Sequence, residues 1–441
     1  MKAVGIDIGT TSISAVLLDA AKKEVLTVKS SPNTAAMEPK MTCDKLQDAD
    51  EIYDICQKLL DGIYSEYNKA EIKAIGVTGQ MHGIVYTDKL GDAVSPLFTW
   101  QDGRGNTPIN DSETYAQRAS EKTGYRLASG FGSVTHYYNT VNNLIPNNAT
   151  CFMTIPDYIA MKLAKRSKPL MHPSMAASIG LYDLNKKRFD EKAAKSLGLD
   201  ISFFPEITDV ECALGKTEDG TPVTVALGDN QAAFLATVNK RESILLNIGT
   251  GSQISIYCDK QGNVKTGEYR PYLKNSFLWV GSPLCGGYSY GILKRFFSDT
   301  LELFGVKDDI DIYRIMNKAG ERLYEQPDKE IPSVDTRFRG TRLNPALRGG
   351  ITGLSETSLT PQHFILGFLQ GIARELFEFY RDFNSETDTY ALVGSGNGLR
   401  ENPLLRQICA DMFGKELTLS DLPEEAACGS ALMAADVAVT K

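Results

Sequence analysis

The sequence predicts an α/β protein made of two similar domains, and three observations support this fold class. A chain of 441 residues is too long for a single hydrophobic core. The order strand, strand, strand, helix, strand occurs twice, and a Gly-Thr turn opens each copy. The two copies meet in Val225–Ser252, where a strand ending in a carboxylate precedes the second such turn. We expect domains at 1–240 and 241–441, with a small-ligand cleft between them.

The first copy begins with alternating, β-rich segments and then shows a helical apolar period. These patterns predict strands at 3–8, 13–18, 24–28 and 72–78, and a helix at 49–67. A further short strand is expected at 97–104. The stretch 108–188 contains predicted helices near 111–123 and 152–164, and we interpret it as an insertion that forms a pocket wall.

The second copy shows the same kinds of pattern. Strands are predicted at 243–248, 253–257, 276–281, 390–393 and 416–419, and helices at 289–303, 361–383, 404–412 and 424–437. The helix at 361–383 has the strongest amphipathic pattern.

Composition argues against several classes of function. The net charge is −8 and the basic residues are scattered, which disfavours a nucleic-acid or anionic membrane surface. Apolar runs are too short to span a membrane, and the N-terminus lacks the apolar core of a signal peptide. The eight cysteines are dispersed without a CxxC pair, so we expect reduced thiols in a cytoplasmic protein. The four histidines show no metal-ligand spacing.

Asp229 is the first candidate catalytic residue. It ends an apolar strand, where a carboxylate is costly unless it is hydrogen-bonded or used in chemistry. Such an Asp can accept a proton from an alcohol during phosphoryl transfer. Gly-Asp-Asn would equally well begin a helix with Asp229 as its cap, so the residues alone leave both roles open.

Two Gly-Thr turns are candidate phosphate sites. Thr10 and Thr11 follow the first strand, and Gly249-Thr250-Gly251 follows the first strand of the second copy. Threonine hydroxyls and turn amides can bind anions, and one turn from each domain would hold a triphosphate from both sides. Asp7 precedes the first turn and could hold Mg²⁺ through water. The alternative is a plain hairpin turn with a capping Asp.

Polar and aromatic residues cluster twice in the first half. A sugar needs hydrogen-bonding groups and one flat apolar face. The candidates for these contacts are Gln80, Met81 and His82 in one cluster and Trp100, Asp102 and Arg104 in the other. The alternatives are a turn histidine, a simple Asp-Gly turn and a core tryptophan.

Small residues after two later elements suggest a nucleotide surface. Gly396 and Asn397 follow a predicted strand, and Gly287 precedes a predicted helix. The GxGxG pattern is not a complete dinucleotide fingerprint, but small residues would let a purine or ribose lie against the backbone.

Taken together, these motifs resemble the FGGY family of carbohydrate kinases, within the actin, Hsp70 and sugar kinase superfamily. The resemblance rests on GIDIGTTS (5–12), GQMHG (79–83), GDNQAA (228–233), NIGTGS (247–252), GGITGLSETSLTPQHFILGFLQ (349–370), GSGNGLRENPLLRQ (394–407) and ACGSALMAA (427–435). These motifs follow the family's order along nearly the whole chain. The resemblance implies two actin-like ATPase (ribonuclease H-like) domains with an interdomain cleft, which close by a hinge motion.

The resemblance also implies roles for the candidate residues. It implies transfer from Mg²⁺-bound ATP to a ketose or polyol hydroxyl, with Asp229 as base and Asp7 near the metal. Thr10, Thr11, Gly249, Thr250 and Gly251 would bind phosphate, and Gly287, Gly396 and Asn397 would lie near adenosine. Gln80, Met81, His82, Trp100, Asp102, Arg104 and Asn230 would contact or surround the sugar. Ser14 departs from the family, which often has Lys or Arg there, so a basic phosphate contact is expected elsewhere or is missing.

Within the family, GQMHG is similar to the form in xylulose and sedoheptulose kinases. TWQDGR (99–104), GFGSVTHYY (130–138) and LCGGYSYG (284–291) are most similar to sedoheptulose kinases, which places xylulose kinases second. A homodimer is a further family-level expectation. The competing class is a nucleotide-gated scaffold or a sugar-sensing pseudokinase. The presence of Asp7, both threonine turns and Asp229 argues against a pseudokinase, and the lack of a further domain after Lys441 argues against a chaperone.

Overall fold

The computed structural model describes residues 1–263, 265–306, 310–327, 329–341, 344, 346–383, 387 and 389–440. The chain forms two compact units. The first unit contains Met1–Ala236, Pro271–Ser276 and the chain from Leu422 onward, and the second contains Thr237–Arg270 and Phe277–Asp421.

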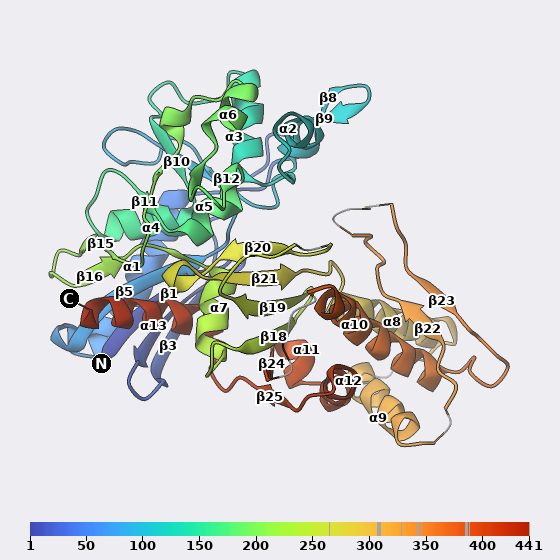
Figure 1. The fold of residues 1–441 in the computed structure, drawn as a ribbon. Coiled ribbons are helices and arrows are strands. Elements are labelled where there is room, and N and C mark those ends of the chain that lie inside the picture. The colour runs from blue at the N-terminus through green and yellow to red at the C-terminus, as the bar shows by residue number, and fades with distance from the viewer. Residues whose placement is uncertain are drawn as a thin grey trace. The chain divides into compact units, whose positions relative to one another are not determined.

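A seven-stranded sheet is the centre of the first unit (Figure 1). Its strand order is β15-β16-β5-β1-β2-β3, and β17 pairs with β5. The strands are β1 (Lys2–Ile8), β2 (Ser12–Asp19), β3 (Glu24–Pro32), β5 (Ile72–Gly79), β15 (Ala213–Lys216), β16 (Pro222–Thr224) and β17 (Leu227–Gly228). β1 is antiparallel to β2 and parallel to β5, and β17 is also parallel to β5. Three parallel strands therefore end at one edge of this sheet.

Helices cover both faces of this sheet. Alternate strand residues point to opposite faces. Val4 packs in the cluster that contains α1 (Ala49–Glu66), whereas Ala3 packs with Ala427 of α13 (Glu425–Val439). α13 approaches very closely, because a Cβ added at Gly5 would lie 1.8 Å from the Ala427 carbonyl oxygen. A larger residue than glycine at position 5 would push α13 off the sheet.

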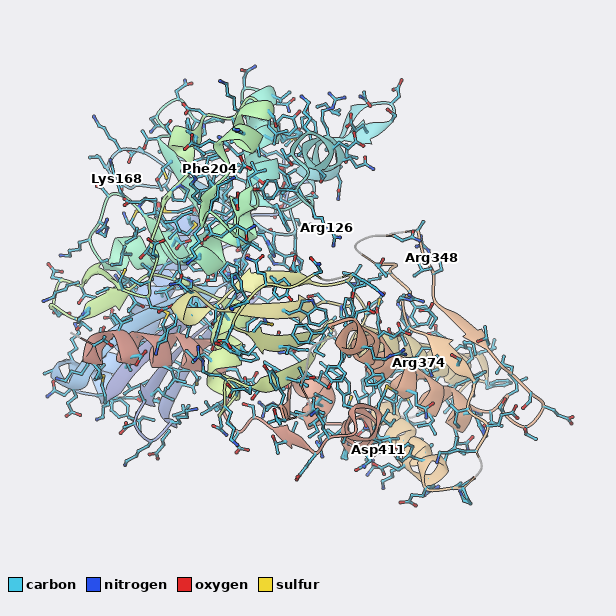
Figure 2. The ribbon with its side chains drawn as sticks, in the orientation of Figure 1. Arg126, Lys168, Phe204, Arg348, Arg374 and Asp411 are labelled. Carbon is cyan, nitrogen blue, oxygen red and sulfur yellow. The ribbon has the colours of Figure 1, made fainter. Side chains whose placement is uncertain are left out.

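Smaller elements complete the first unit. The helices are α2 (Tyr115–Thr123), α3 (Gly132–Val141), α4 (Ile155–Leu163), α5 (Pro173–Ile179), α6 (Glu191–Ser196) and α7 (Asp229–Thr237), whose last residue belongs to the second unit. The strands are β4 (Leu46–Gln47), β6 (Val85–Thr87), β7 (Leu97–Phe98), β8 (Pro108–Asn110), β9 (Glu113–Thr114), β10 (Cys151–Met153), β11 (Leu170–Met171), β12 (Tyr182–Asp183), β13 (Arg188–Phe189) and β14 (Glu206–Ile207). Phe204, labelled in Figure 2, lies in this part of the core. Its ring packs against those of Phe152 and Phe189.

The second unit is built on a six-stranded sheet in the order β20-β21-β19-β18-β24-β25. Its strands are β18 (Ser243–Ile248), β19 (Ser252–Cys258), β20 (Glu268–Pro271), β21 (Phe277–Gly281), β24 (Ala391–Ser395) and β25 (Leu417–Leu419), with a separate pair of β22 (Ser333–Asp335) and β23 (Gly350–Thr352). Its helices are α8 (Gly287–Leu303), α9 (Ile312–Tyr324), α10 (Pro361–Phe383), α11 (Asn397–Arg400) and α12 (Pro403–Phe413).

The predicted duplication is confirmed by the strand orders. β3-β2-β1-β5 in the first unit corresponds to β21-β19-β18-β24 in the second, with the same antiparallel and parallel pairings. The predicted helix at 361–383 is confirmed in full. The helix expected at 111–123 begins only at Tyr115, because the Thr114 side chain caps it and a β8–β9 hairpin precedes it. The strand expected at 97–104 is wrong beyond Phe98.

The compact units differ from the predicted division at residue 240. α13, which fell in the predicted domain 241–441, packs on β1 and β5 of the first unit. Its small residues permit this contact: a Cβ added at Gly429 would lie 1.8 Å from the Ala232 carbonyl oxygen of α7. Local patterns cannot show that the last helix packs on the first sheet, because this packing depends on contacts between residues far apart in the sequence.

All eight cysteines are free thiols. Among the helices that the structure describes, none has both the length and the apolar character needed to cross a bilayer.

Candidate functional site

The first candidate site lies where β1, β5 and β17 end together. Asp7 of β1 is level with Thr78 of β5, and Gly228 of β17 is level with Gly79 of β5. The two carboxylates predicted to be functional, Asp7 and Asp229, therefore leave the sheet at the same edge, separated by one strand. The Thr78 hydroxyl donates to the Leu227 carbonyl at 2.7 Å and holds this edge together.

Asp7 lies in a strongly negative environment. Burial, followed by the charges of Asp229 and Glu424, raises the pKa of Asp7 to about 7. Asp229 and Glu424 belong to the same unit and come from the starts of α7 and α13. Loss of water and nearby like charges both favour a neutral acid. A bound cation would relieve this concentration of negative charge.

Asp229 lies at the start of a helix and also close to Asp7. It is the first residue of α7, and its Oδ1 accepts a hydrogen bond from the Asn230 backbone N–H at 2.5 Å. It is also half-buried, and its negative charge contributes to the raised pKa of Asp7. The helix start thus positions the carboxylate at the strand edge rather than on an open surface.

Backbone and side-chain hydrogen bonds hold the first threonine turn. The Asn33 side chain donates to the Gly9 carbonyl and its backbone N–H donates to the Thr11 carbonyl, both at 2.9 Å. Trp100 Nε1 donates to Thr10 Oγ1 at 3.0 Å. The first predicted phosphate turn therefore contacts a residue predicted for the sugar.

Gln47 links the same turn to the GQMHG segment. Its Nε2 donates to the Thr10 carbonyl at 3.0 Å, and its Oε1 accepts from Gln80 Nε2 at 2.8 Å. Gln80 Oε1 is buried and has no hydrogen-bond partner among the described residues. A buried acceptor without a partner is costly and suits a ligand hydroxyl. Sequence reasoning missed Gln47, which lies in a two-residue strand with no motif around it.

His82 and Met81 follow Gln80. His82 has a positive φ of 74°, its ring stacks on Phe131 at 4.6 Å, and its Nδ1 lies 2.7 Å from the Ser178 carbonyl. A carbonyl oxygen can only accept a hydrogen bond, so Nδ1 carries the hydrogen and donates it; in a neutral imidazole with this tautomer Nε2 is an acceptor. Met81 is buried, and a Cβ added at Gly228 would lie 2.9 Å from its Cε.

Asp102 and Arg104 form a buried ion pair. Arg104 Nε donates to Asp102 Oδ1 at 2.5 Å, Nη1 donates to Asn139 at 2.7 Å, and Nη2 lies 3.3 Å from Asp44. The Lys45 backbone N–H donates to the other Asp102 oxygen. The structure therefore places these two residues as supports for the loop that carries Trp100. Trp100 itself is 46% exposed, which rules out the core alternative.

Ser174 is another residue that the sequence did not indicate. Its Oγ accepts the Gly228 backbone N–H at 3.0 Å, and the preceding His172 lies within 2.8 Å of the same hydroxyl. This contact fixes the end of β17 just before Asp229. No motif surrounds Ser174, so only its position in the fold reveals it.

The second candidate site lies at the matching edge of the second sheet. The Gly287 N–H donates to the Gly249 carbonyl at 2.8 Å, and the Tyr288 N–H donates to the Thr250 carbonyl at 2.9 Å. Thr250 and Gly251 are exposed. The first two residues of α8 therefore close this turn. Gly249 and Gly287, both predicted to contact the nucleotide, are joined by one hydrogen bond.

Gly396 and Asn397 join the same edge. β24 runs parallel to β18, with Ser395 level with Asn247. Gly396 has a positive φ of 84°, and a Cβ there would lie 2.5 Å from the Ile248 carbonyl oxygen. The structure therefore brings together the six residues predicted for the nucleotide in this half: Gly249, Thr250, Gly251, Gly287, Gly396 and Asn397.

The residues present fit a partly hydrated Mg²⁺ better than a protein-only metal cage. Among the described residues there is no group of three or more His, Cys, Asp or Glu side chains placed to hold a metal. Mg²⁺ usually keeps several waters and takes one or two carboxylates plus substrate phosphates. Asp7, half-buried beside the first threonine turn, suits that arrangement. Ser14 is level with Asp7 on β2, but its hydroxyl bonds to Ser30 at 2.8 Å and carries no charge.

Known proteins match both halves of the chain. Models for the N-terminal and C-terminal domains of the FGGY family of carbohydrate kinases match residues 2–236 and 317–437. A sedoheptulokinase of Homo sapiens is 27% identical over 474 residues, covering 98% of this chain and 96% of the relative. A sedoheptulokinase of Mus musculus is 26% identical over 448 residues (92% and 91%), and a gluconokinase of Bacillus subtilis is 24% identical over 466 residues (98% and 86%).

Solved structures support the same fold. A xylulose kinase from Rhodospirillum rubrum has a TM-score of 0.85 at 19% identity, covering 99% of this chain and 89% of that one. A gluconate kinase from Lactobacillus acidophilus has a TM-score of 0.84 at 18% identity, covering 100% and 89%. The predicted fold class of two actin-like ATPase domains is confirmed. The chain belongs to the FGGY family of carbohydrate kinases, ATP-dependent phosphotransferases with an alcohol group as acceptor.

Proposed function

We propose that this kinase phosphorylates the terminal hydroxyl of sedoheptulose and produces sedoheptulose 7-phosphate. The observation that carries the proposal is the shared edge of β1, β5 and β17, where Asp7, Gln80 and Asp229 lie together. The choice of sugar is favoured by two sedoheptulokinase relatives that align over at least 91% of both chains. Xylulose is the second candidate, because the GQMHG motif is common to both kinds of kinase.

Asp229 acts as the general base. Its carboxylate takes the proton of the sugar hydroxyl while the hydroxyl oxygen forms a bond to the γ-phosphorus of ATP. The bond between that phosphorus and the β,γ-bridging oxygen breaks, and ADP leaves with the electron pair. The Asn230 N–H bond orients the carboxylate, and Ser174 holds the strand end that precedes it.

Each unit has one threonine turn whose groups suit phosphate. Thr10 and Thr11 contribute hydroxyl and backbone groups in the first unit, and Gly249–Gly251 contributes backbone groups in the second. Gly287, Gly396 and Asn397 leave space for adenosine beside the backbone. Asp7 would help to hold Mg²⁺, which would neutralise charge on the phosphates when bound with ATP.

The sugar is recognised by groups that project near Asp229. Gln80 Oε1 accepts a hydroxyl, which resolves its lack of a partner. His82 Nε2 accepts a second hydroxyl, since Nδ1 is committed to Ser178. The exposed Trp100 ring offers an apolar face, and Met81 and Asn230 border the reacting hydroxyl. The buried ion pair of Asp102 and Arg104 stabilises the loop that carries Trp100.

A substrate panel tests the proposal. Purified protein with Mg²⁺ and ATP is assayed for ADP release on sedoheptulose, D-xylulose, D-gluconate and glycerol, and the product is identified by ³¹P NMR. We expect the highest kcat/KM on sedoheptulose and a phosphate on its terminal carbon. A higher kcat/KM on D-xylulose than on sedoheptulose would contradict the proposal and identify the protein as a xylulokinase. Binding of sugar and nucleotide without turnover would favour a pseudokinase.

A further inference from the structure

A pair of arginines lies beside the second phosphate turn and has no role in the assignments above. The turn Gly249–Gly251 is closed by the first two residues of α8, Gly287 and Tyr288, through their backbone N–H groups. The Tyr288 side chain therefore begins within one hydrogen bond of the Thr250 carbonyl. Groups that contact this side chain are therefore held on the helix start that closes the turn.

Two guanidinium groups surround Tyr288. Arg339 stacks on its ring, with 3.7 Å between the guanidinium carbon and the ring centroid. Arg295 is seven residues further along α8, which places it two turns away on the same helix face. The guanidinium groups of Arg339, first, and Arg295 favour the charged form of the nearby phenol and lower the pKa of Tyr288. Two positive charges therefore lie near one tyrosine side chain.

Within the part of the chain that the structure describes, neither arginine has an acidic partner. Among the described residues, no Asp or Glu oxygen lies within 4.0 Å of the charged nitrogens of Arg295 or Arg339. Arg337, only two residues before Arg339, shows the contrast, because Asp335 binds it with two hydrogen bonds of 2.8 and 2.6 Å. Two like charges held together without an acid repel each other, and a bound anion would reverse this cost.

We propose that Arg295 and Arg339 bind the phosphate chain of the nucleotide at the Gly249–Gly251 turn. This proposal rests on the proposed nucleotide role of that turn. Arginine suits phosphate because its planar fork donates several hydrogen bonds at once. The pair supplies positive charge to a turn that otherwise offers only amides and a hydroxyl. In the first unit, the residue level with Asp7 on the neighbouring strand is the uncharged Ser14.

Calorimetric titration with ADP, AMP and adenosine tests this assignment on the full chain. The variants are Arg295→Ala, Arg339→Ala and the double substitution, with Arg339→Lys as the variant that keeps the charge. Arg322→Ala, an exposed arginine in the last turn of α9, is the matched control for net charge. Thermal melts confirm that each variant is folded before titration.

We expect the double variant to bind ADP roughly 10–100-fold more weakly, since each charge-assisted bond to phosphate contributes strongly. Adenosine affinity should remain unchanged, AMP should show a smaller loss than ADP, and Arg339→Lys should recover part of the ADP affinity. Unchanged ADP affinity in the double variant would overturn the proposal. An equal loss for adenosine would also overturn it, because the arginines would then shape the base site. Sugar turnover is not needed, so a wild-type protein that binds ADP but phosphorylates no ketose would refute the proposed substrate and leave this assignment standing.

Discussion

The two sheets have the same strand order but carry different chemistry at their matching edges. β1 leads into Asp7-Ile8-Gly9-Thr10, and β18 leads into Asn247-Ile248-Gly249-Thr250. The two segments differ only at their first residue, where an amide replaces a carboxylate. Asp7 is level with Thr78 of the neighbouring parallel strand, and Asn247 is level with Ser395.

The difference at this residue is one of several between the two edges. The first edge gathers the negative charges of Asp7, Asp229 and Glu424, which suits a cation and a base. The second edge gathers the glycines at 249, 251, 287 and 396 with an exposed threonine, which suits phosphate and nucleoside. A duplicated fold can thus divide one reaction between its halves by changing a few residues at equivalent strand ends.

The largest expected effect comes from removing the base. Asp229→Asn leaves the first edge without its proton acceptor, so kcat should fall roughly 10²–10⁴-fold while the sugar Kd stays largely unchanged. Steady-state kinetics and direct sugar binding measure the two quantities. Asp219→Asn, an exposed acid paired with Lys69 in the same unit, is the control. Wild-type-like kcat in Asp229→Asn would refute the role of Asp229.

The next effect comes from giving both turns the same amide residue. Asp7→Asn places Asn where the second unit has Asn247, and kcat/KM should fall on the order of 10–100-fold through weaker Mg²⁺ binding. Mg²⁺ titration of the activity should show a higher half-saturation concentration. Asn247→Asp serves as the reciprocal variant and should leave the Mg²⁺ requirement unchanged. An unaltered Mg²⁺ titration in Asp7→Asn would show that the metal lies elsewhere.

Each unit also contains a buried carboxyl group, away from the candidate sites, whose contribution to stability depends on pH. Burial raises the pKa of Asp157 in α4 and of Glu375 in α10 to about 7. Because the folded pKa exceeds the unfolded one, each group's contribution to stability is present below about pH 4 and is lost as pH rises to about 7. Asp157 Oδ1 has no partner among the described residues, whereas Glu375 accepts from Thr336 and lies near Arg337.

We therefore expect Asp157→Asn to raise the free energy of unfolding at pH 8 by about 2 kcal/mol, and Glu375→Gln to raise it less. The gain should disappear at pH 4 to 5. Thermal melts of wild type and both variants across pH 5–8.5 measure the difference, with roughly 2–4 °C expected per kcal/mol. A gain that is independent of pH would contradict ionisation as its cause.

The smallest effect concerns Gln47, which links the first turn to the sugar segment. Gln47→Ala should raise the sugar KM roughly 3–10-fold with little change in kcat, because Gln80 loses the partner that orients its amide. Gln47→Glu keeps an acceptor for Gln80 but loses the donor to Thr10, so it should affect the ATP KM more than the sugar KM. Gln57→Ala, on α1 and bonded to Tyr53, is the matched control. Equal effects on both KM values in both variants would argue for a structural role alone.

Much of the fold was predictable because it is encoded locally. The alternation of residues 3–8 and 243–248 predicts the central strands, and the apolar period of 361–383 predicts α10. The motifs also located Asp7, Gln80, Asp229 and the second turn. Boundaries near caps were less predictable, because Thr114 and Thr154 begin their helices later than periodicity suggests.

The sequence by itself determined the fold class, the duplicated strand order and the kinase family, because strand and helix periods and short motifs are properties of neighbouring residues. Only the tertiary structure decided that Asp102 and Arg104 pair with each other, that Gln47 joins the first turn to Gln80, and that α13 returns to the first sheet. These outcomes depend on which distant side chains become buried together. Burial is set by the packing of the whole chain and not by any local pattern.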